Sequence, residues 1–446
     1  MQTKHLSTVV ILTGLSLTAN AAESGQHGFF EDSQATISNR TMYYGNDNHD
    51  GGADQRESAT ALKFDYKSGF TQGTVGFGLD VSSLIAVHLD GGKGHHPDNG
   101  NYFPSDSDGS AAHEWSRAGG IFKARVSKTE LRIGNTFTPN LPILVSTDSR
   151  LVSQNFAGGM ITSKEIDGLT INAGKLQSSS GRATTNPTGL SVAGGTQDSN
   201  DFRFAGGDWK VTKDLTLQYY YANLENYYKQ NFLGLVHVLP LGEDQSFKTD
   251  LRYFDSSSDG KNGEAGYRFN NNGGYAKHPG EVDNKTWSAM FTYSLGSHAF
   301  TLGHQSVSDD GGFVWLNQGS VVNGNNRPEG NGGTAFYSFT DAMVASFARA
   351  GEQTNFGQYA YDFAGLGVPG LKAAVAYLSG DNAKDVRGGS DHSEWERDVR
   401  VDYVIQTGPL KGFGTTLRHG TYRGDNSAFA DQDQTRLIFN YTYSFL

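Results

Sequence analysis

Residues Thr435–Leu446, with the sequence TRLIFNYTYSFL, carry the pattern that decides the fold. Apolar and aromatic side chains alternate with polar ones, and this period of two predicts a β-strand with two different faces. One face carries Arg436 and Asn440, and the other is apolar and aromatic as far as Phe445. The chain therefore ends in a strand that has one polar and one strongly aromatic side.

The same alternation recurs along the chain, for example in residues 62–66, 215–221, 247–253, 287–295 and 399–405. In a soluble β-sandwich the apolar faces would form the core, whereas in a transmembrane barrel they would face lipid and the polar faces would line a lumen. The apolar faces end in Tyr and Phe, as membrane-interface girdles do, and the polar faces repeatedly carry Arg and Lys. We therefore predict an all-β, closed antiparallel transmembrane β-barrel, since an open sheet in lipid would leave unpaired edge groups.

The two ends of the predicted barrel differ in the lengths of their connections. Long segments rich in Gly, Asn and Asp at residues 45–56, 90–116, 255–284 and 309–333 alternate with turns as short as Ser127-Lys128. This asymmetry is typical of long external loops and short periplasmic turns. At about 10 residues for each strand, the chain suits roughly 16–18 strands.

Composition and the N-terminus limit the possible functions. The 446 residues include no Cys, which excludes disulfides, thiolate metal sites and cysteine nucleophiles. The net charge of −11, without a basic block, argues against nucleic-acid binding. Residues 1–21, with Lys4, an apolar stretch and Ala19-Asn20-Ala21, predict a cleaved signal peptide. Residues 22–446 are predicted to be one barrel domain in the bacterial outer membrane.

No motif predicts catalysis, a cofactor or a metal site. The chain lacks a nucleophile elbow, a phosphate-binding glycine loop and a zinc-protease motif. Asp106-Ser-Asp-Gly109 is similar to the start of a calcium loop, but Arg117 occupies the place of the distal Glu. His95 and His96 are adjacent, so they cannot easily share one metal ion, and we expect them in a solvated loop.

Basic side chains recur on the polar phase of the strands. On the lipid side such charges would cost about 2–4 kcal/mol near the membrane midplane, so we expect them to face inward. A row of cations along a narrow aqueous lumen attracts anions, although pairing of each arginine with a wall carboxylate is an alternative. The residues are Lys123, Arg125, Arg132, Arg203, Lys248, Arg252, Arg400, Arg418 and Arg436.

Residues 135–156 interrupt the strand pattern with Pro139, Pro142 and a short apolar core. Non-strand backbone at membrane depth is tolerated only where it is buried in protein or lines a cavity. This stretch, which contains Arg150, is therefore predicted to fold into the lumen and narrow it. An ordinary loop packed on the barrel rim is the alternative.

Several motifs resemble those of the OprD-type (Occ) substrate-specific porins of pseudomonads, and the resemblance covers nearly the whole mature chain. These motifs are GFFEDS at 28–33, LPIL at 141–144, TDSRL at 147–151, SKEIDGL at 163–169, QSFKTDLRYF at 245–254, YDFAGLGVPGL at 361–371 and EWERD at 394–398. The resemblance implies 18 strands, an inward constriction loop and an arginine ladder for small carboxylate-bearing solutes, such as amino acids or organic and aromatic acids.

By motif, the ladder positions implied by this resemblance are Arg40, Arg150, Arg182 and Arg436, with Arg349 as a weaker match, and Asp148 and Ser149 are expected to help orient the solute. Two departures matter. Ala350 follows Arg349 where many relatives have Pro, and Tyr359 stands where a strand arginine is common, so the ladder is expected to be thinner on that wall.

The leading hypothesis is a substrate-selective porin, not an enzyme. The alternatives are a general diffusion porin, a barrel-borne outer-membrane hydrolase and a soluble binding module. The expected partners are small anionic or zwitterionic solutes, outer-membrane lipid and lipopolysaccharide, and the barrel-assembly machinery, while homotrimeric association stays open.

Overall fold

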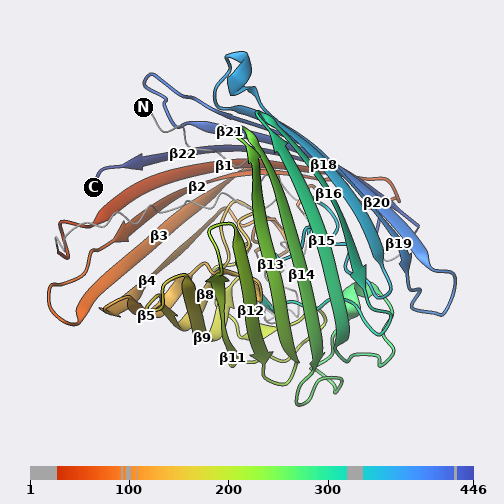
Figure 1. The fold of residues 1–446 in the computed structure, drawn as a ribbon. Helices are drawn as coiled ribbons and strands as arrows, with labels where there is room; N and C mark the ends of the chain where they lie inside the picture. The colour runs from red at the N-terminus through yellow and green to blue at the C-terminus, as the bar shows by residue number, and fades with distance from the viewer. Residues whose placement is uncertain (1–27, 92–93, 97–101, 107, 319–334, 426–428) are drawn as a thin grey trace.

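The computed structural model describes residues 28–446, apart from 92–93, 97–101, 107, 319–334 and 426–428. The predicted signal peptide, residues 1–21, lies outside the described residues and stays a prediction. Eighteen antiparallel strands form one closed sheet, which confirms the predicted barrel (Figure 1). No described helix is long and apolar enough to span a membrane.

The barrel strands follow one another in chain order around the wall. They are β1 (Gln34–Asn48), β2 (Gln55–Lys67), β3 (Gly76–Asp90), β4 (Glu114–Val126), β5 (Thr129–Phe137), β8 (Asn155–Ser163), β9 (Leu169–Ser180), β11 (Phe202–Lys210), β12 (Leu215–Leu224), β13 (Tyr228–Gly242), β14 (Gln245–Ser258), β15 (Asp283–Leu295), β16 (His298–Val307), β18 (Gln353–Asp362), β19 (Leu371–Ala383), β20 (His392–Val404), β21 (Gly414–Gly424) and β22 (Gln432–Ser444).

The other elements are short and lie in the connections. They are β6 (Asn140–Leu141), β7 (Leu144–Val145), β10 (Leu190–Ser191), β17 (Asn317–Gln318) and the 3₁₀ turns η1 (Asn271–Gly273) and η2 (Phe363–Leu366).

The first and last strands close the barrel. β1 pairs antiparallel with β22 from Thr36↔Ser444 to Asn48↔Gln432, and Figure 1 shows the red β1 and the dark blue β22 side by side. Closure satisfies the backbone groups that an open sheet would expose to hydrocarbon. The start of β1 and the end of β22 lie at the end of the barrel that has the short turns, as expected for the periplasmic side.

The connections differ in length between the two ends as predicted. β4 and β5 are joined by two residues, whereas β3 and β4 are separated by residues 91–113, and β16 and β18 by residues 308–352. The predicted loop at 255–284 is shorter than expected, because β14 continues to Ser258 and pairs there with Tyr228 of β13.

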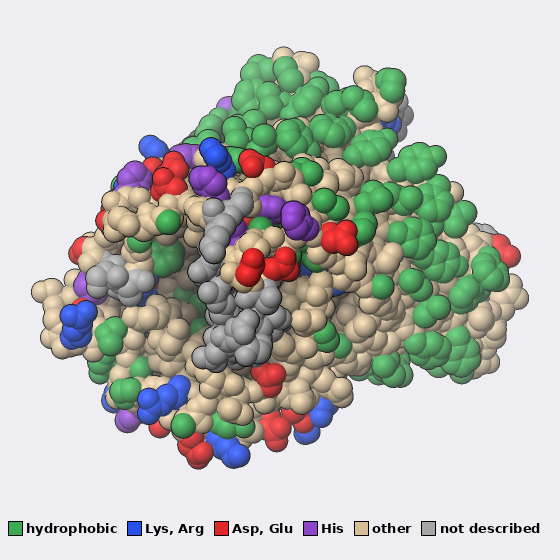
Figure 2. Space-filling model, turned by 180° about the vertical axis from the view of Figure 1, so that it is seen from behind, with side chains coloured by type: hydrophobic (Ala, Val, Ile, Leu, Met, Phe, Trp, Pro, Cys, Tyr) green, Lys and Arg blue, Asp and Glu red, His purple; other side chains and the backbone are tan. Residues whose placement is uncertain are grey.

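The outer wall is apolar. Phe122, Ile133, Leu251 and Leu417 alternate with inward residues and are 38–52% exposed. Figure 2 shows apolar side chains spread over the wall, whereas charged side chains gather around one end of the molecule. The arrangement matches a band that faces hydrocarbon between polar ends.

The interior differs from the sequence-based expectation on one wall, because inward positions there are aromatic rather than polar. Phe202, Phe204, Phe232 and Phe254 are buried and pack with loop side chains in one cluster. Since Phe202 and Phe204 point inward, Arg203 points outward, where it is 67% exposed and paired with an acid at the strand end. The inward prediction for Arg203 was therefore wrong.

The expectation of a solvated histidine pair was wrong for His96. Its side chain is fully buried, its Nδ1 contacts a carboxylate oxygen of Glu57, and its Nε2 lies 2.7 Å from Ser105 Oγ. These contacts hold the β3–β4 loop against the barrel. Within the described residues no group of histidine and acidic side chains is suited to hold a metal ion.

Candidate functional site

The loop that connects β5 and β8 enters the lumen, as predicted. Arg40 on β1, four strands away from β5, donates to both carboxylate oxygens of Asp148 at 2.9 and 3.0 Å. It also donates to the carbonyl of Arg150 at 2.9 Å. Because β1 and β5 are not neighbours, these bonds show that residues 138–154 reach across the interior rather than cover the rim.

A second loop, residues 335–352 between β16 and β18, also enters the lumen, and the sequence analysis missed this. Glu396 on β20 is fully buried and accepts hydrogen bonds from the backbone N–H groups of Val344 and Ala345 at 2.8 and 2.7 Å. Asp398 accepts another from the N–H of Met343 at 3.1 Å. Acidic side chains on the inner face of β20 therefore hold this loop by its backbone.

Two of the predicted site arginines fasten the same loop. Arg252 lies between the rings of Tyr337 and Phe339, at 3.7 and 3.6 Å from their centroids, and pairs with Asp250 at 3.1 Å. Arg349 is 7% exposed and forms an ion pair with Glu394 of β20. Both guanidinium groups are thus committed to protein partners.

A group of four arginines gathers where the two inward loops meet the wall, and we call it the arginine cluster. Arg150 comes from the first loop, Arg182 from the connection after β9, and Arg418 and Arg436 from the inner faces of β21 and β22. Each interacts electrostatically with at least one of the others. Because the four like charges lie close together, they give this part of the lumen a positive field.

Tyr102, from the β3–β4 loop, packs against this cluster. The guanidinium of Arg150 lies 3.7 Å from the Tyr102 ring centroid, and Arg436 Nη2 donates to the Tyr102 hydroxyl at 3.1 Å. The ring also stacks on Tyr44 of β1. Three loops therefore converge on the same point of the barrel.

Arg418 differs from the other members of the arginine cluster. Within the described residues its guanidinium makes no hydrogen bond and no ion pair, and it is half-buried. Of the carboxylates near it, Glu396 accepts through both oxygens, and Asp398 through Oδ2, from backbone N–H groups of the second loop. Its donors are thus available to a solute in the lumen.

Asp341, in the second loop, faces the arginine cluster. Its Oδ2 accepts from the backbone N–H of Phe336 at 3.3 Å. Burial raises the pKa of Asp341, against the opposing effects of this hydrogen bond and of Arg182, Arg150 and Arg418, to about 7. The carboxyl group is therefore poised to change its charge near neutral pH.

This pKa predicts a pH-dependent selectivity. Below about pH 7 Asp341 is neutral, so the net positive charge of the constriction rises and preference for anions increases as the pH falls from 8 to 6. Reversal potentials under a salt gradient measure this preference. Asp341→Asn should show at both pH values the stronger anion preference that the wild type shows at pH 6. If the variant keeps the full pH dependence, Asp341 is not the group responsible for it.

Another basic group lies nearer the periplasmic end of the lumen. Lys123 on β4 pairs with Asp80 at 2.7 Å, and Arg132 on β5 approaches the same carboxylate at 3.3 Å. Arg125 stacks on the ring of Phe70 at 4.1 Å from its centroid. All three project inward, as the strand phase predicts.

The remaining predicted site residues are held by close partners. Arg400 makes two bonds to Asp402, at 2.6 and 2.9 Å. Ser149 Oγ accepts from Arg150 Nη1 at 3.1 Å. Arg400 therefore pairs with a wall carboxylate, as the alternative interpretation of the basic residues allows. Ser149 contacts a member of the arginine cluster directly.

Arg117 is an inward cation that the sequence analysis missed. It shares the phase of Lys123 and Arg125 on β4, so the alternation was a usable signal. Its Nη1 donates to the carbonyls of Ser153 and Ser180 at 3.2 and 3.4 Å, next to the first loop.

Known proteins share this architecture. The sequence model of the family described as "outer membrane porin, OprD family" matches residues 27–445. Porin D of Pseudomonas aeruginosa is 32% identical, over 94% of this chain and 92% of its own length. The crystal structure of P. aeruginosa OccK8 (OprE) is 42% identical with a TM-score of 0.83, covering 94% of this chain and all of that one.

Two similar structures were solved with a small carboxylate ligand. P. aeruginosa OpdK was solved with vanillate and OccK2 (OpdF) in complex with glucuronate. Each is 32% identical and covers 94% of this chain and all of its own, with TM-scores of 0.79 and 0.77. The relatives are porins, which are channels rather than enzymes, and they indicate an outer-membrane location. The closed 18-stranded barrel and the family match over residues 27–445 together show that the chain belongs to the OprD family of outer membrane porins.

Proposed function

We propose that this porin admits small carboxylate-bearing solutes by passive, selective diffusion, and that the arginine cluster is where it recognises them. The observation that carries the proposal is the gathering of Arg150, Arg182, Arg418 and Arg436 at the meeting point of the inward loops, with the donors of Arg418 free of protein partners among the described residues. General diffusion would not require such a concentration of like charge.

In this mechanism the solute diffuses down its own concentration gradient, and the charge of the lumen raises its local concentration. The periplasmic and central basic groups attract an anion, and the Arg418 guanidinium offers a carboxylate two parallel N–H donors. Arg150, stacked on Tyr102, adds a second weak contact. Several weak sites in sequence let a solute enter and leave, as conduction requires.

The substrate class is inferred from chemistry and from the relatives. OpdK with vanillate and OccK2 with glucuronate each hold a small ring that bears one carboxylate. Tyr102 and Tyr44 place aromatic surface beside the arginine cluster of this chain. We therefore propose small aromatic or sugar acids as the solutes.

The test compares vanillate with vanillyl alcohol, which carries a neutral hydroxymethyl group in place of the carboxylate, on the full-length porin in planar bilayers. We expect an anion-biased reversal potential under a salt gradient and transient current blocks by vanillate but not by the alcohol. Equal responses to both compounds, with little ion selectivity, would instead support a general diffusion porin.

A further inference from the structure

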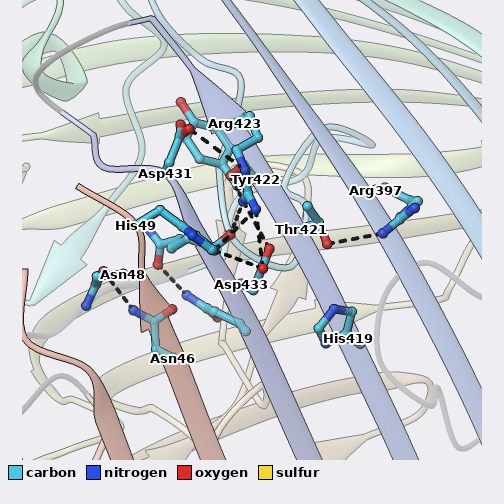
Figure 3. Close-up of polar contacts among 12 residues, drawn as sticks. Asn46, Asn48, His49, Arg397, His419, Thr421, Tyr422, Arg423, Asp431 and Asp433 are labelled. Carbon is cyan, nitrogen blue, oxygen red and sulfur yellow. Dashed lines mark hydrogen bonds and ion pairs between the residues drawn. The ribbon is translucent and has the colours of Figure 1, made fainter. Parts of the chain in front are cut away.

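One arginine lies on the outside of the barrel without an acidic partner. Arg397 on β20 points outward and is exposed, and its one hydrogen bond to a described residue reaches Thr421 Oγ1 at 3.4 Å (Figure 3). No described carboxylate is within ion-pair distance of it. By contrast, the neighbouring outward Arg423 pairs with Asp433 at 3.0 Å.

The surroundings of Arg397 belong to the membrane-facing wall. Trp395 and Val399 flank it on the outer face of β20, and Trp395 stacks on Tyr377 with ring centroids 5.8 Å apart. Stacked Trp and Tyr side chains are typical of the interface between headgroups and hydrocarbon. At this level an outward cation costs only about 0–1 kcal/mol, and an anion of the membrane beside it is the natural partner for its charge.

A groove begins beside this cation. It is an open surface groove of about 470 Å³ on the outer faces of β16, β18 and β19, and Leu302, Gly357, Tyr359, Val375 and Tyr377 line it. This volume lies within the ~300–1,000 Å³ typical of ligand pockets. Because the lining is part of the lipid-facing band, its natural occupant is an acyl chain.

The register of the sheet connects the cation with the groove. Gly357 pairs with Tyr377, and Tyr377 pairs with Arg397, so the three residues lie in one row across β18, β19 and β20. With strands about 4.8 Å apart, Gly357 lies roughly 10 Å from the Arg397 backbone. Gly357 forms the floor, because it has no side chain.

The groove also has a polar end. His304 Nδ1 and Asn355 Oδ1 lie 2.9 Å apart on the outer faces of β16 and β18, on the side toward the long loops. The polar groups therefore lie toward the long loops and the apolar lining toward the membrane centre. This is the order of the polar linkage and the acyl chain in a membrane lipid.

We propose that this surface is a binding site for one phosphorylated, multiply acylated glycolipid of the outer leaflet, of the lipid A type. A phosphate pairs with Arg397, and an acyl chain lies in the groove over Gly357. Charge complementarity at Arg397 and continuity with the lipid-facing wall support this occupant. The site is on the opposite side of the wall from the lumen, so it does not depend on the proposed transport function.

The test measures lipid retention by native mass spectrometry of the full-length porin in detergent, with lipid A, its dephosphorylated form and phosphatidylglycerol as separate probes. Arg397→Gln removes the cation, and Gly357→Val fills the groove. A Cβ at Gly357 would approach Leu302 Cδ2 at 3.2 Å, and that side-chain end is free to move. Heat-modifiable gel mobility checks that each barrel is folded.

Two outward positions elsewhere on the barrel serve as matched controls. Arg203→Gln removes an outer cation that already has an acidic partner, Asp201, at 2.6 Å. Gly159→Val adds a side chain where the nearest atoms are 3.8 Å away, beside Ile133 of the neighbouring strand. Neither change touches the proposed site.

We expect one lipid A bound to the wild type, and about tenfold weaker retention in each of the two site variants but not in the controls. Arg397→Gln should bind dephosphorylated lipid A and lipid A equally well, because the variant has no cation for the phosphate to pair with. Equal retention by the site and control variants would overturn the proposal. If phosphatidylglycerol binds as tightly as lipid A, the choice of lipid is wrong. If the wild type forms dimers that Gly357→Val does not form, the groove is occupied by a second barrel instead.

Discussion

Replacing Arg418 by Gln is expected to weaken vanillate binding in the lumen by about 10- to 150-fold, the effect of losing a hydrogen bond between charged groups worth about 1.5–3 kcal/mol. The guanidinium of Arg418 makes no hydrogen bond or ion pair with a described residue, so its donors are uncommitted before the solute arrives. The removed interaction is therefore one with the solute, and the wall itself loses no bond.

The measurement is the concentration dependence of current block in single-channel recordings. Arg400→Gln is the matched control, since Arg400 lies opposite Arg418 on the adjacent strand but already bonds Asp402 through two nitrogens. It should change the block far less. If both variants bind vanillate equally, or as tightly as the wild type, Arg418 is not the recognition residue.

Replacing Glu396 by Gln is expected to loosen the second inward loop and raise the single-channel conductance. The buried carboxylate accepts from two adjacent backbone N–H groups, at Val344 and Ala345. The amide keeps one acceptor and turns a donor toward the other N–H, which costs about 1.5–3 kcal/mol of loop attachment. A loop that leaves the lumen part of the time widens the path for ions.

Conductance and its fluctuations in symmetrical salt check this expectation. Asp402→Asn is the control, because Asp402 faces the lumen from the same strand but bonds Arg400 and Thr416 rather than a loop. A Glu396→Gln channel with the conductance and noise of the wild type would show that the other loop contacts suffice to hold residues 335–352.

The sequence was most informative where one strand could be considered alone. The alternation in Thr435–Leu446 predicted a strand whose Arg436 faces inward, and β22 confirms it by placing Arg436 against Tyr102. Residues 135–156 were predicted to enter the lumen because their prolines break the strand pattern, and the bonds from Arg40 confirm that. Both predictions depend on local backbone geometry.

The predictions that failed needed knowledge of distant partners. Arg203 was expected inside, but the neighbouring Phe202 and Phe204 bury their rings against inward loops and force it outward. His96 was expected in solvent, although Glu57, 39 residues away, draws it into the protein. The second inward loop, residues 335–352, contains no strand-breaking proline like those of the first. Its backbone is held by carboxylates on β20 that lie 51 to 55 residues away in the sequence.

The sequence by itself thus determined the all-β barrel, its two-faced strands and the first constriction loop, because side-chain period and backbone-breaking residues act over a few neighbouring positions. Only the tertiary structure decided which arginines keep guanidinium donors that no acidic side chain occupies. Arg252, Arg349 and Arg400 lose their donors to Asp250, Glu394 and Asp402, whereas Arg418 keeps its own. Arg252, Arg400 and Arg418 look alike on their alternating strands, and only the groups that closure of the barrel brings near them make them different.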